Sequence, residues 1–200
     1  MYFVHPQIKL SVLGHVLMSQ TIQKYFPDKQ LVFTDMGRSA FKIIIEKLNL
    51  QNSEILMPAY ICDIFIPILE NYNIKPIFLD IDIKTFNIKT EEIAHKITLQ
   101  TKAILVSHTY GLPVDIQKIR EITKNQLFII EDCAHSFGAG TGNSGDAALF
   151  SLYKQFPTLR GGLLVCPKDW QVQLPKTSFN FRDFISFLNC FPAFAFLFKK

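Results

Sequence analysis

The fold of this chain is decided by the stretch Leu127-Phe128-Ile129-Ile130-Glu131-Asp132-Cys133-Ala134-His135. Its first four residues are all apolar, which is typical of a strand that is buried on both faces of a parallel sheet. The run ends in two carboxylates, so we expect Asp132 at the carboxyl edge of that sheet. The stretch therefore predicts a buried strand that presents an acidic side chain at one edge.

A second apolar run carries a basic side chain to a comparable position. It reads Ala147-Ala148-Leu149-Phe150 and is followed by Ser151-Leu152-Tyr153-Lys154. A pyridoxal phosphate enzyme needs an amine that bonds to the cofactor and a carboxylate that keeps the ring nitrogen protonated. Asp132 and Lys154 are therefore candidate catalytic residues. Taken alone, such a pair is more often a solvated edge or a surface ion pair.

Strand-like and helix-like segments alternate along the chain, which predicts βα units and a largely parallel sheet. We expect strands over 54–57, 75–79, 102–107, 127–131, 147–152 and 162–166. Helices are expected over 39–48, 63–72, 90–97 and 115–124, the last capped by Asp115. Before Leu31 the pattern is weaker, and the one candidate element there is a helix over 10–25.

Short motifs occur in a fixed order over most of the chain. They are Gly37-Arg38-Ser39-Ala40, Ile55-Leu56-Met57-Pro58-Ala59-Tyr60, Pro76-Ile77-Phe78-Leu79-Asp80-Ile81-Asp82, Thr85-Phe86-Asn87-Ile88, Thr101-Lys102-Ala103-Ile104, His108-Thr109-Tyr110-Gly111, Pro113-Val114-Asp115, Ile130-Glu131-Asp132-Cys133-Ala134-His135, Gly145-Asp146, Phe150-Ser151 and Gly161-Gly162-Leu163-Leu164-Val165. By this order and spacing, the chain resembles the sugar aminotransferases of the DegT/DnrJ/EryC1/StrS family. The resemblance implies an α/β large domain of fold type I, similar to aspartate aminotransferase, with a mostly parallel sheet flanked by helices and pyridoxal 5'-phosphate as cofactor.

The resemblance also implies which residues contact the cofactor. Ser39 and Ala40 would bind its phosphate at the start of a helix, where free amides and the positive dipole end meet an anion. Ser151 would bind the phosphate as well, and His135 would contact the hydroxyl side of the ring. An ordinary N-cap serine is the simpler interpretation of Ser39 without the other motifs. His108 and Tyr110 are expected to line the pocket.

Two positions depart from the family pattern. Lys154 follows Ser151 by three residues, whereas most members place the lysine five residues after the serine, where this chain has Phe156. The alternative is that Lys154 is a surface lysine and the chain is inactive. Cys62 stands where the family has the aromatic residue that stacks on the ring, which leaves Tyr60 or another side chain to cover it.

Two other kinds of site are rejected. The loop Gly140-Thr141-Gly142-Asn143-Ser144-Gly145 satisfies the dinucleotide pattern G-x-G-x-x-G, but it precedes a strand instead of opening a helix. We therefore reject NAD binding and expect a connecting loop. Asp132 and His135 lack the further Cys and His ligands that a metal centre needs, so no metal is expected.

Composition limits which partners and which cellular compartment we expect for this chain. The 200 residues carry a net charge of +4, and no basic run interleaves with aromatics, so we expect no nucleic acid partner. The four cysteines form no C-x-x-C pair, which suits reduced thiols in a cytoplasmic protein. The apolar segment 184–198 is interrupted by Asn189 and Pro192, so we expect a core helix, with an interfacial membrane anchor as the alternative.

We expect an N-terminal segment (1–30), a cofactor-binding large domain (31–170) and the start of a truncated C-terminal region (171–200). By resemblance, the chain would transfer an amino group, from glutamate, to a nucleotide-linked keto-sugar, as a homodimer with its site between subunits. Two alternatives stay open. One is a truncated or degenerate remnant without turnover, and the other is a nucleotide-binding α/β protein without pyridoxal phosphate.

Overall fold

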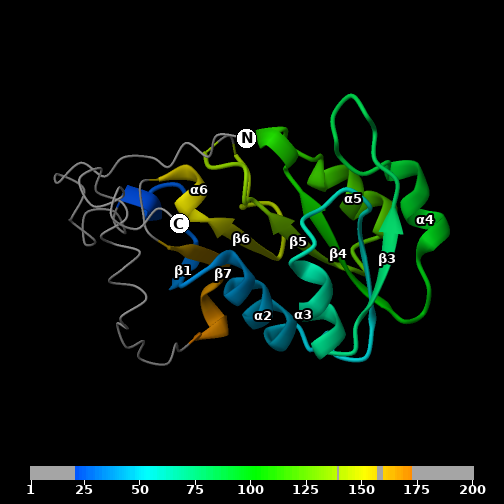
Figure 1. The fold of residues 1–200 in the computed structure, drawn as a ribbon, viewed down its shortest axis with the longest axis horizontal. Coiled ribbons are helices and arrows are strands. Elements are labelled where there is room, and N and C mark those ends of the chain that lie inside the picture. Colours follow the sequence, from blue (N-terminus) through cyan, green and yellow to red (C-terminus); the bar gives the residue numbers. More distant parts are fainter. Residues whose placement is uncertain (1–20, 139, 157–159, 173–200) are drawn as a thin grey trace, which may run out of the picture.

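A single twisted sheet organises the part of the chain that the computed structural model describes, which is residues 21–138, 140–156 and 160–172. The sheet has seven strands in the order β1-β7-β6-β5-β4-β2-β3 (Figure 1). Their bounds are β1 Lys29–Thr34, β2 Glu54–Pro58, β3 Lys75–Leu79, β4 Thr101–Ser107, β5 Phe128–Asp132, β6 Ala147–Ser151 and β7 Gly162–Pro167.

All strands except β7 run in one direction. The pairs β2·β3, β2·β4, β4·β5 and β5·β6 are parallel, whereas β7 is antiparallel to both of its neighbours, β6 and β1. The predicted mostly parallel sheet is therefore confirmed. The carboxyl ends of β4, β5 and β6 meet at one edge together with the first residue of β7.

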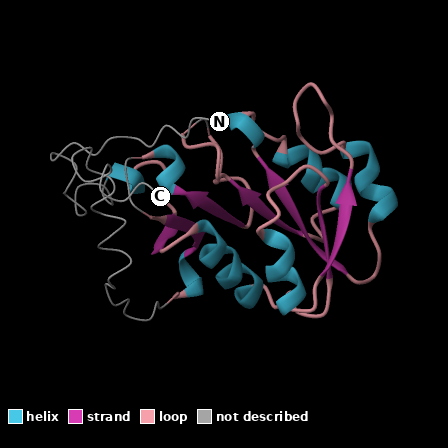
Figure 2. Cartoon of the chain, in the orientation of Figure 1, coloured by secondary structure: helices cyan, strands magenta, loops and turns pink. Residues whose placement is uncertain are grey.

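Helices cover both faces of the sheet (Figure 2). One face packs against α2 (Gly37–Lys47) and α3 (Phe65–Asn71), whose apolar side chains form one core cluster with Ile130 and Leu105. The other face packs against α4 (Ile93–Lys96) and α5 (Ile116–Thr123), which form a second cluster with Ile129 and Val106. Successive strand residues point to opposite faces, so β2, β4 and β5 each contribute to both clusters, whereas β6 and β7 contribute to the first cluster and to a third one with Ile22 and Phe26. This explains why the inner strands read as continuous apolar runs.

Most predicted elements are present within one or two residues of their expected bounds. β3 spans the predicted residues, and α5 is capped as expected, because the Asp115 side chain accepts a hydrogen bond from the Lys118 amide at 3.0 Å. The helix expected over 90–97 is split into a 3₁₀ turn, η2 (Thr90–Glu92), and the short α4. Short 3₁₀ turns, η3 (Thr109–Gly111) and η4 (Lys168–Trp170), and the single-turn α6 (Leu152–Gln155) complete the described elements.

Two expectations near the start of the chain need correction or fall outside the structure. α2 begins at Gly37 with Met36 as its N-cap, so Ser39 lies inside the first turn instead of capping the helix. β1 was not predicted, because its apolar run, Leu31-Val32-Phe33, is short and only Val32 of the strand is buried, as suits an edge strand. The helix expected over 10–25 lies mostly outside the described residues. The part of it that is described begins at residue 21, and residues 21–23 are helical.

The C-terminal apolar segment 184–198 also lies outside the described residues. Among the helices that are described, none combines the length and the apolar character needed to cross a bilayer.

Gly162, the first residue of β7, allows α2 to begin directly against the sheet edge. It pairs with Thr34 on one side and Ser151 on the other. A Cβ atom at this position would lie 2.3 Å from the carbonyl carbon of Met36 and 2.5 Å from the amide nitrogen of Gly37. These are backbone atoms that cannot rotate away, so any larger residue has to displace the start of α2.

We therefore expect Gly162→Ala to lower the free energy of unfolding by about 1–3 kcal/mol, the usual range for overpacking in a close-packed interior. Gly37→Ala is the matched control on the other side of the same contact. Its Cβ would lie 3.1 Å from the Ser151 hydroxyl oxygen, which can rotate away, and 3.3 Å from the Phe150 carbonyl oxygen, a contact that a shift of a few tenths of an ångström relieves. Urea unfolding of the two variants checks this, and equal losses of stability would contradict the assignment.

Candidate active site

A cavity of about 550 Å³ opens at the carboxyl edge of the sheet, on the face covered by α2 and α3. Four of the predicted site residues line it: Asp132, His135, Ser151 and Lys154. These side chains come from the ends of β5 and β6 and from the segments that follow. The arrangement brings together the carboxylate and the amine that the sequence placed on separate strand ends.

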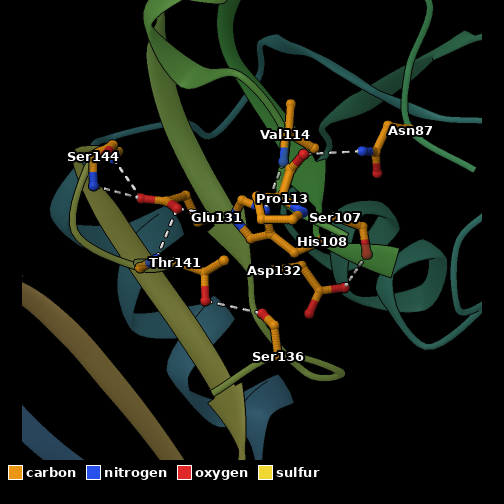
Figure 3. Close-up of polar contacts among 12 residues, drawn as sticks. Asn87, Ser107, His108, Pro113, Val114, Glu131, Asp132, Ser136, Thr141 and Ser144 are labelled. Atoms are coloured by element: carbon orange, nitrogen blue, oxygen red, sulfur yellow. Dashed lines mark hydrogen bonds and ion pairs between the residues drawn. The ribbon is translucent and has the colours of Figure 1, made fainter. Parts of the chain in front are cut away.

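Asp132 is the last residue of β5 and is 5% exposed. One carboxylate oxygen accepts a hydrogen bond from the Ala134 amide at 3.0 Å. The other accepts one from the Ser107 hydroxyl at 3.3 Å (Figure 3). Burial raises the pKa of Asp132, although the Ala134 amide and the charges of Lys154 and His135 act in the opposite direction. Its anion is therefore incompletely compensated, and a cationic partner in the cavity would stabilise it.

Lys154 reaches the cavity from α6, and its Nζ atom lies 3.3 Å from Nε2 of His135. The pKa of His135 is lowered by partial burial and by the nearby charge of Lys154, while the charge of Asp132 opposes this shift. A neutral imidazole can accept a hydrogen bond from the amine. The amine, the imidazole and the buried carboxylate therefore form one cluster.

The start of α2 forms another wall of the cavity, but through different residues than expected. Gly37 and Arg38 line the cavity, whereas Ser39 and Ala40 do not. The Ser39 amide already donates to the Met36 carbonyl at 3.0 Å, and Ala40 is fully buried in the core. The sequence signal was the motif Gly37–Ala40 itself, whose first two residues, instead of its last two, reach the cavity.

Aromatic rings border the mouth of the cavity. The hydroxyl oxygens of Tyr60 and Tyr110 are 2.7 Å apart, and this hydrogen bond raises the pKa of Tyr110. Phe86 packs between them, with ring centroids 5.7 Å from Tyr60 and 5.3 Å from Tyr110. The Tyr110 ring lies parallel to that of His135 at 6.0 Å. Cys62 lines the cavity beside these rings, so aromatic cover has to come from its neighbours.

His108 does not line this cavity, which corrects one expectation. Its side chain is 1% exposed and lies on the opposite face of the sheet, where it contacts Glu131. The loop Gly140–Gly145 leads into strand β6, as predicted, and its amides also contact Glu131. Both features belong to a network behind the cavity.

The donor set suits pyridoxal phosphate. The buried, incompletely compensated Asp132 fits a protonated ring nitrogen, and the Lys154 amine fits an aldehyde. A phosphate fits the start of α2, because the first amides of a helix bind anions. The Ser151 hydroxyl is close to these amides: a Cβ atom on Gly37 would lie 3.1 Å from its oxygen.

Comparisons with known proteins agree with this geometry. A family model described as the DegT/DnrJ/EryC1/StrS aminotransferase family matches residues 17–176. A GDP-perosamine synthase from Escherichia coli O157:H7 is 35% identical over 123 residues, which are 58% of this chain and 34% of that enzyme.

Solved structures show the same fold. An aminotransferase from Psychrobacter cryohalolentis has a TM-score of 0.74 at 22% identity, over 85% of this chain and 50% of that one. A GDP-4-keto-6-deoxymannose-3-dehydratase with a trapped PLP–glutamate geminal diamine has a TM-score of 0.68 at 29% identity, over 74% of this chain and 42% of that one. This chain thus spans half or less of the length of these relatives.

The expected family, its α/β fold and its cofactor are confirmed by these matches. The matched proteins include a dehydratase as well as transaminases. Membership of the family therefore identifies the cofactor, but it does not identify the reaction. The match over residues 17–176 covers most of the sequence, and this chain belongs to the pyridoxal phosphate-dependent DegT/DnrJ/EryC1/StrS aminotransferase family.

Proposed function

We propose that this chain is the cofactor-binding part of an aminotransferase that acts on nucleotide-linked keto-sugars. The observation that supports this most directly is that Asp132 and Lys154 line one cavity, with His135 in contact with the lysine amine. When bound, pyridoxal phosphate supplies an electron sink for the bond that breaks at the amino-bearing carbon. The residues of the chain supply binding, orientation and proton transfer.

Each residue has a distinct task in this proposal. Lys154 would hold the cofactor aldehyde through its amine, and the same amine is placed to accept and return a proton at the substrate carbon. Asp132 would keep the ring nitrogen protonated, and His135 would donate to or accept from the ring hydroxyl. The phosphate would be held at the start of α2, by the backbone of Gly37 and Arg38 together with the Ser151 hydroxyl, all of which line the cavity.

The proposed substrates follow from the relatives. The GDP-perosamine synthase and a dTDP-3-amino-3,6-dideoxy-alpha-D-galactopyranose transaminase from Aneurinibacillus thermoaerophilus are named for nucleotide-linked amino sugars. The dehydratase structure contains a PLP–glutamate adduct, which supports glutamate as the amino donor. We propose a nucleotide-linked keto-sugar as acceptor and a homodimer as the working form.

Three alternatives compete with this proposal. The chain could be a remnant that folds without turnover, or it could bind a nucleotide without pyridoxal phosphate. A dehydratase is the third, because one of the matched structures has that activity. The Lys154 amine in the cavity favours amino transfer, since a lysine amine can both form an imine with the cofactor aldehyde and transfer a proton at the substrate carbon.

Lys154→Ala is expected to abolish covalent attachment of the cofactor. The wild-type chain mixed with pyridoxal phosphate should gain a visible absorbance band, and borohydride reduction should fix the added mass on the peptide that contains Lys154. Lys168→Ala is the control, because this exposed lysine lies beyond β7 and does not line the cavity. A wild-type chain that stays colourless, or a modified peptide without Lys154, would contradict the assignment.

Asp132→Asn is expected to stabilise the cofactor-free protein while weakening cofactor binding. Because burial raises the folded-state pKa of Asp132, ionisation of this group lowers the stability of the wild-type chain as the pH rises above 3.8, the ordinary value. Asparagine does not ionise, so it carries no such cost. The difference in the free energy of unfolding between Asp132→Asn and the wild type should therefore increase above that pH and then become constant. Losing a charge-assisted hydrogen bond of about 1.5–3 kcal/mol should weaken cofactor binding roughly 10- to 100-fold.

Thermal or urea unfolding across a pH series checks the first effect, and absorbance titration with pyridoxal phosphate checks the second. A variant that is less stable than wild type at every pH would show that Asp132 is a structural residue instead.

A further inference from the structure

Glu131 directly precedes Asp132 on β5, and its side chain lies on the opposite face of the sheet. Its carboxylate is 1% exposed and accepts four hydrogen bonds (Figure 3). Three come from backbone amides of one loop: Gly142 at 2.8 Å, Ser144 at 2.9 Å and Gly145 at 2.5 Å. The loop Gly140–Gly145, which matches the dinucleotide pattern G-x-G-x-x-G, thus uses its amides to bind a carboxylate of the chain itself.

The fourth partner of Glu131 is His108, and the surroundings fix the tautomer of its ring. Nδ1 of His108 accepts a hydrogen bond from the Val114 amide at 3.0 Å, so this nitrogen carries no proton. The ring proton therefore sits on Nε2, which donates to Glu131 at 2.8 Å. We call this pair the Glu131–His108 lock.

The lock joins two loops to the strand that carries Asp132. Through Val114 it closes the segment 108–114, in which Thr109 and Tyr110 line the cavity. The His108 amide donates to the Asp132 carbonyl at 3.0 Å, and the preceding Ser107 hydroxyl donates to the Asp132 carboxylate. His108 therefore holds both Asp132 and one wall of the cavity from behind the sheet.

A metal centre is the competing explanation for this cluster. Ligand atoms of His108, Glu131 and Cys133 lie within 4.8 Å of one another, and all three residues are buried. However, both ring nitrogens of His108 and both oxygens of Glu131 already have hydrogen-bond partners. Burial also raises the pKa of the Cys133 thiol well above its ordinary value, which disfavours the thiolate that binds metals. Hydrogen bonding accounts for the cluster better.

We propose that Glu131 and His108 are positioning residues, which hold Asp132 and the segment 109–111 in the geometry that the cofactor requires. This proposal rests on the proposed function for its purpose, but the placement itself concerns the cofactor-free chain. His108 is held by Val114 and Glu131, and Glu131 is held by three amides, so neither side chain can shift without leaving a buried donor unpaired.

Substitution at either residue breaks the lock in a specific way. In Glu131→Gln, an amide NH₂ group would replace one acceptor oxygen and would face other donors. In His108→Asn, the side-chain carbonyl can still accept from Val114, but the shorter side chain loses the donor to Glu131. Glu54→Gln is the control, because Glu54 is a buried carboxylate at the opposite, amino-terminal end of β2 and is hydrogen-bonded to Lys75, Thr98 and Thr101.

The test measures the pKa of Asp132 in the cofactor-free protein by carbon-13 NMR. The charged groups that face Asp132 are Lys154 and His135, and none of the three substitutions touches them. Releasing the lock should let water reach Asp132, so both His108→Asn and Glu131→Gln should lower its pKa by about one unit or more, while Glu54→Gln should leave it unchanged. Because His108 is neutral here, a shift in His108→Asn cannot arise from a lost charge.

A folded His108→Asn with an unchanged pKa of Asp132, or an equal shift in Glu54→Gln, would overturn the proposal. If neither lock variant folds, amide hydrogen exchange of the wild-type chain decides. The amides of Val114, Gly142, Ser144 and Gly145 should exchange as slowly as those of β4 and β5, and fast exchange would overturn the proposal. A wild-type chain that binds no pyridoxal phosphate would contradict the proposed function but leave this result intact.

Discussion

Two adjacent carboxylates end β5, and the rest of the structure depends on how the sheet compensates each of them. Glu131 receives four hydrogen bonds, and although burial acts against it, the bonds from His108, Gly145 and Gly142 lower its pKa. Asp132 receives two, and burial raises its pKa. The carboxylate of Glu131 is thus satisfied by hydrogen bonds within the protein, whereas that of Asp132 would gain further stabilisation from a cation bound in the cavity.

This difference arises from the two faces of the sheet. Behind the sheet, a loop rich in glycine can bring several amides to one carboxylate; a Cβ on Gly145 would lie 2.8 Å from the Ile129 carbonyl oxygen. On the front, the start of α2 and the single turn of α6 leave a cavity instead of donors. The same strand end therefore serves structure on one face and a ligand site on the other.

The sequence was sufficient for the inner strands and for the convergence of Asp132, His135, Ser151 and Lys154, because continuous apolar runs mark buried parallel strands and their ends share an edge. It was insufficient for β1, whose edge position leaves a mixed pattern. It also placed His108 in the cavity, since the motif shows that His108 follows β4 but not which face it takes. The helix start was misplaced because Met36, a residue that cannot cap through its side chain, precedes α2.

The antiparallel direction of β7 has a consequence for the lysine. β6 ends and β7 begins at the same edge, where Ser151 pairs with Gly162 and the Leu152 amide donates to the Gly161 carbonyl at 2.9 Å. Lys154 therefore lies in a connection whose two ends, at Ser151 and Gly162, are paired with each other, so their positions do not depend on the length of the connection. Insertions or deletions there leave the strand register intact, so the spacing between serine and lysine is free to vary among related proteins, provided that the amine still reaches the carboxylate side of the cavity.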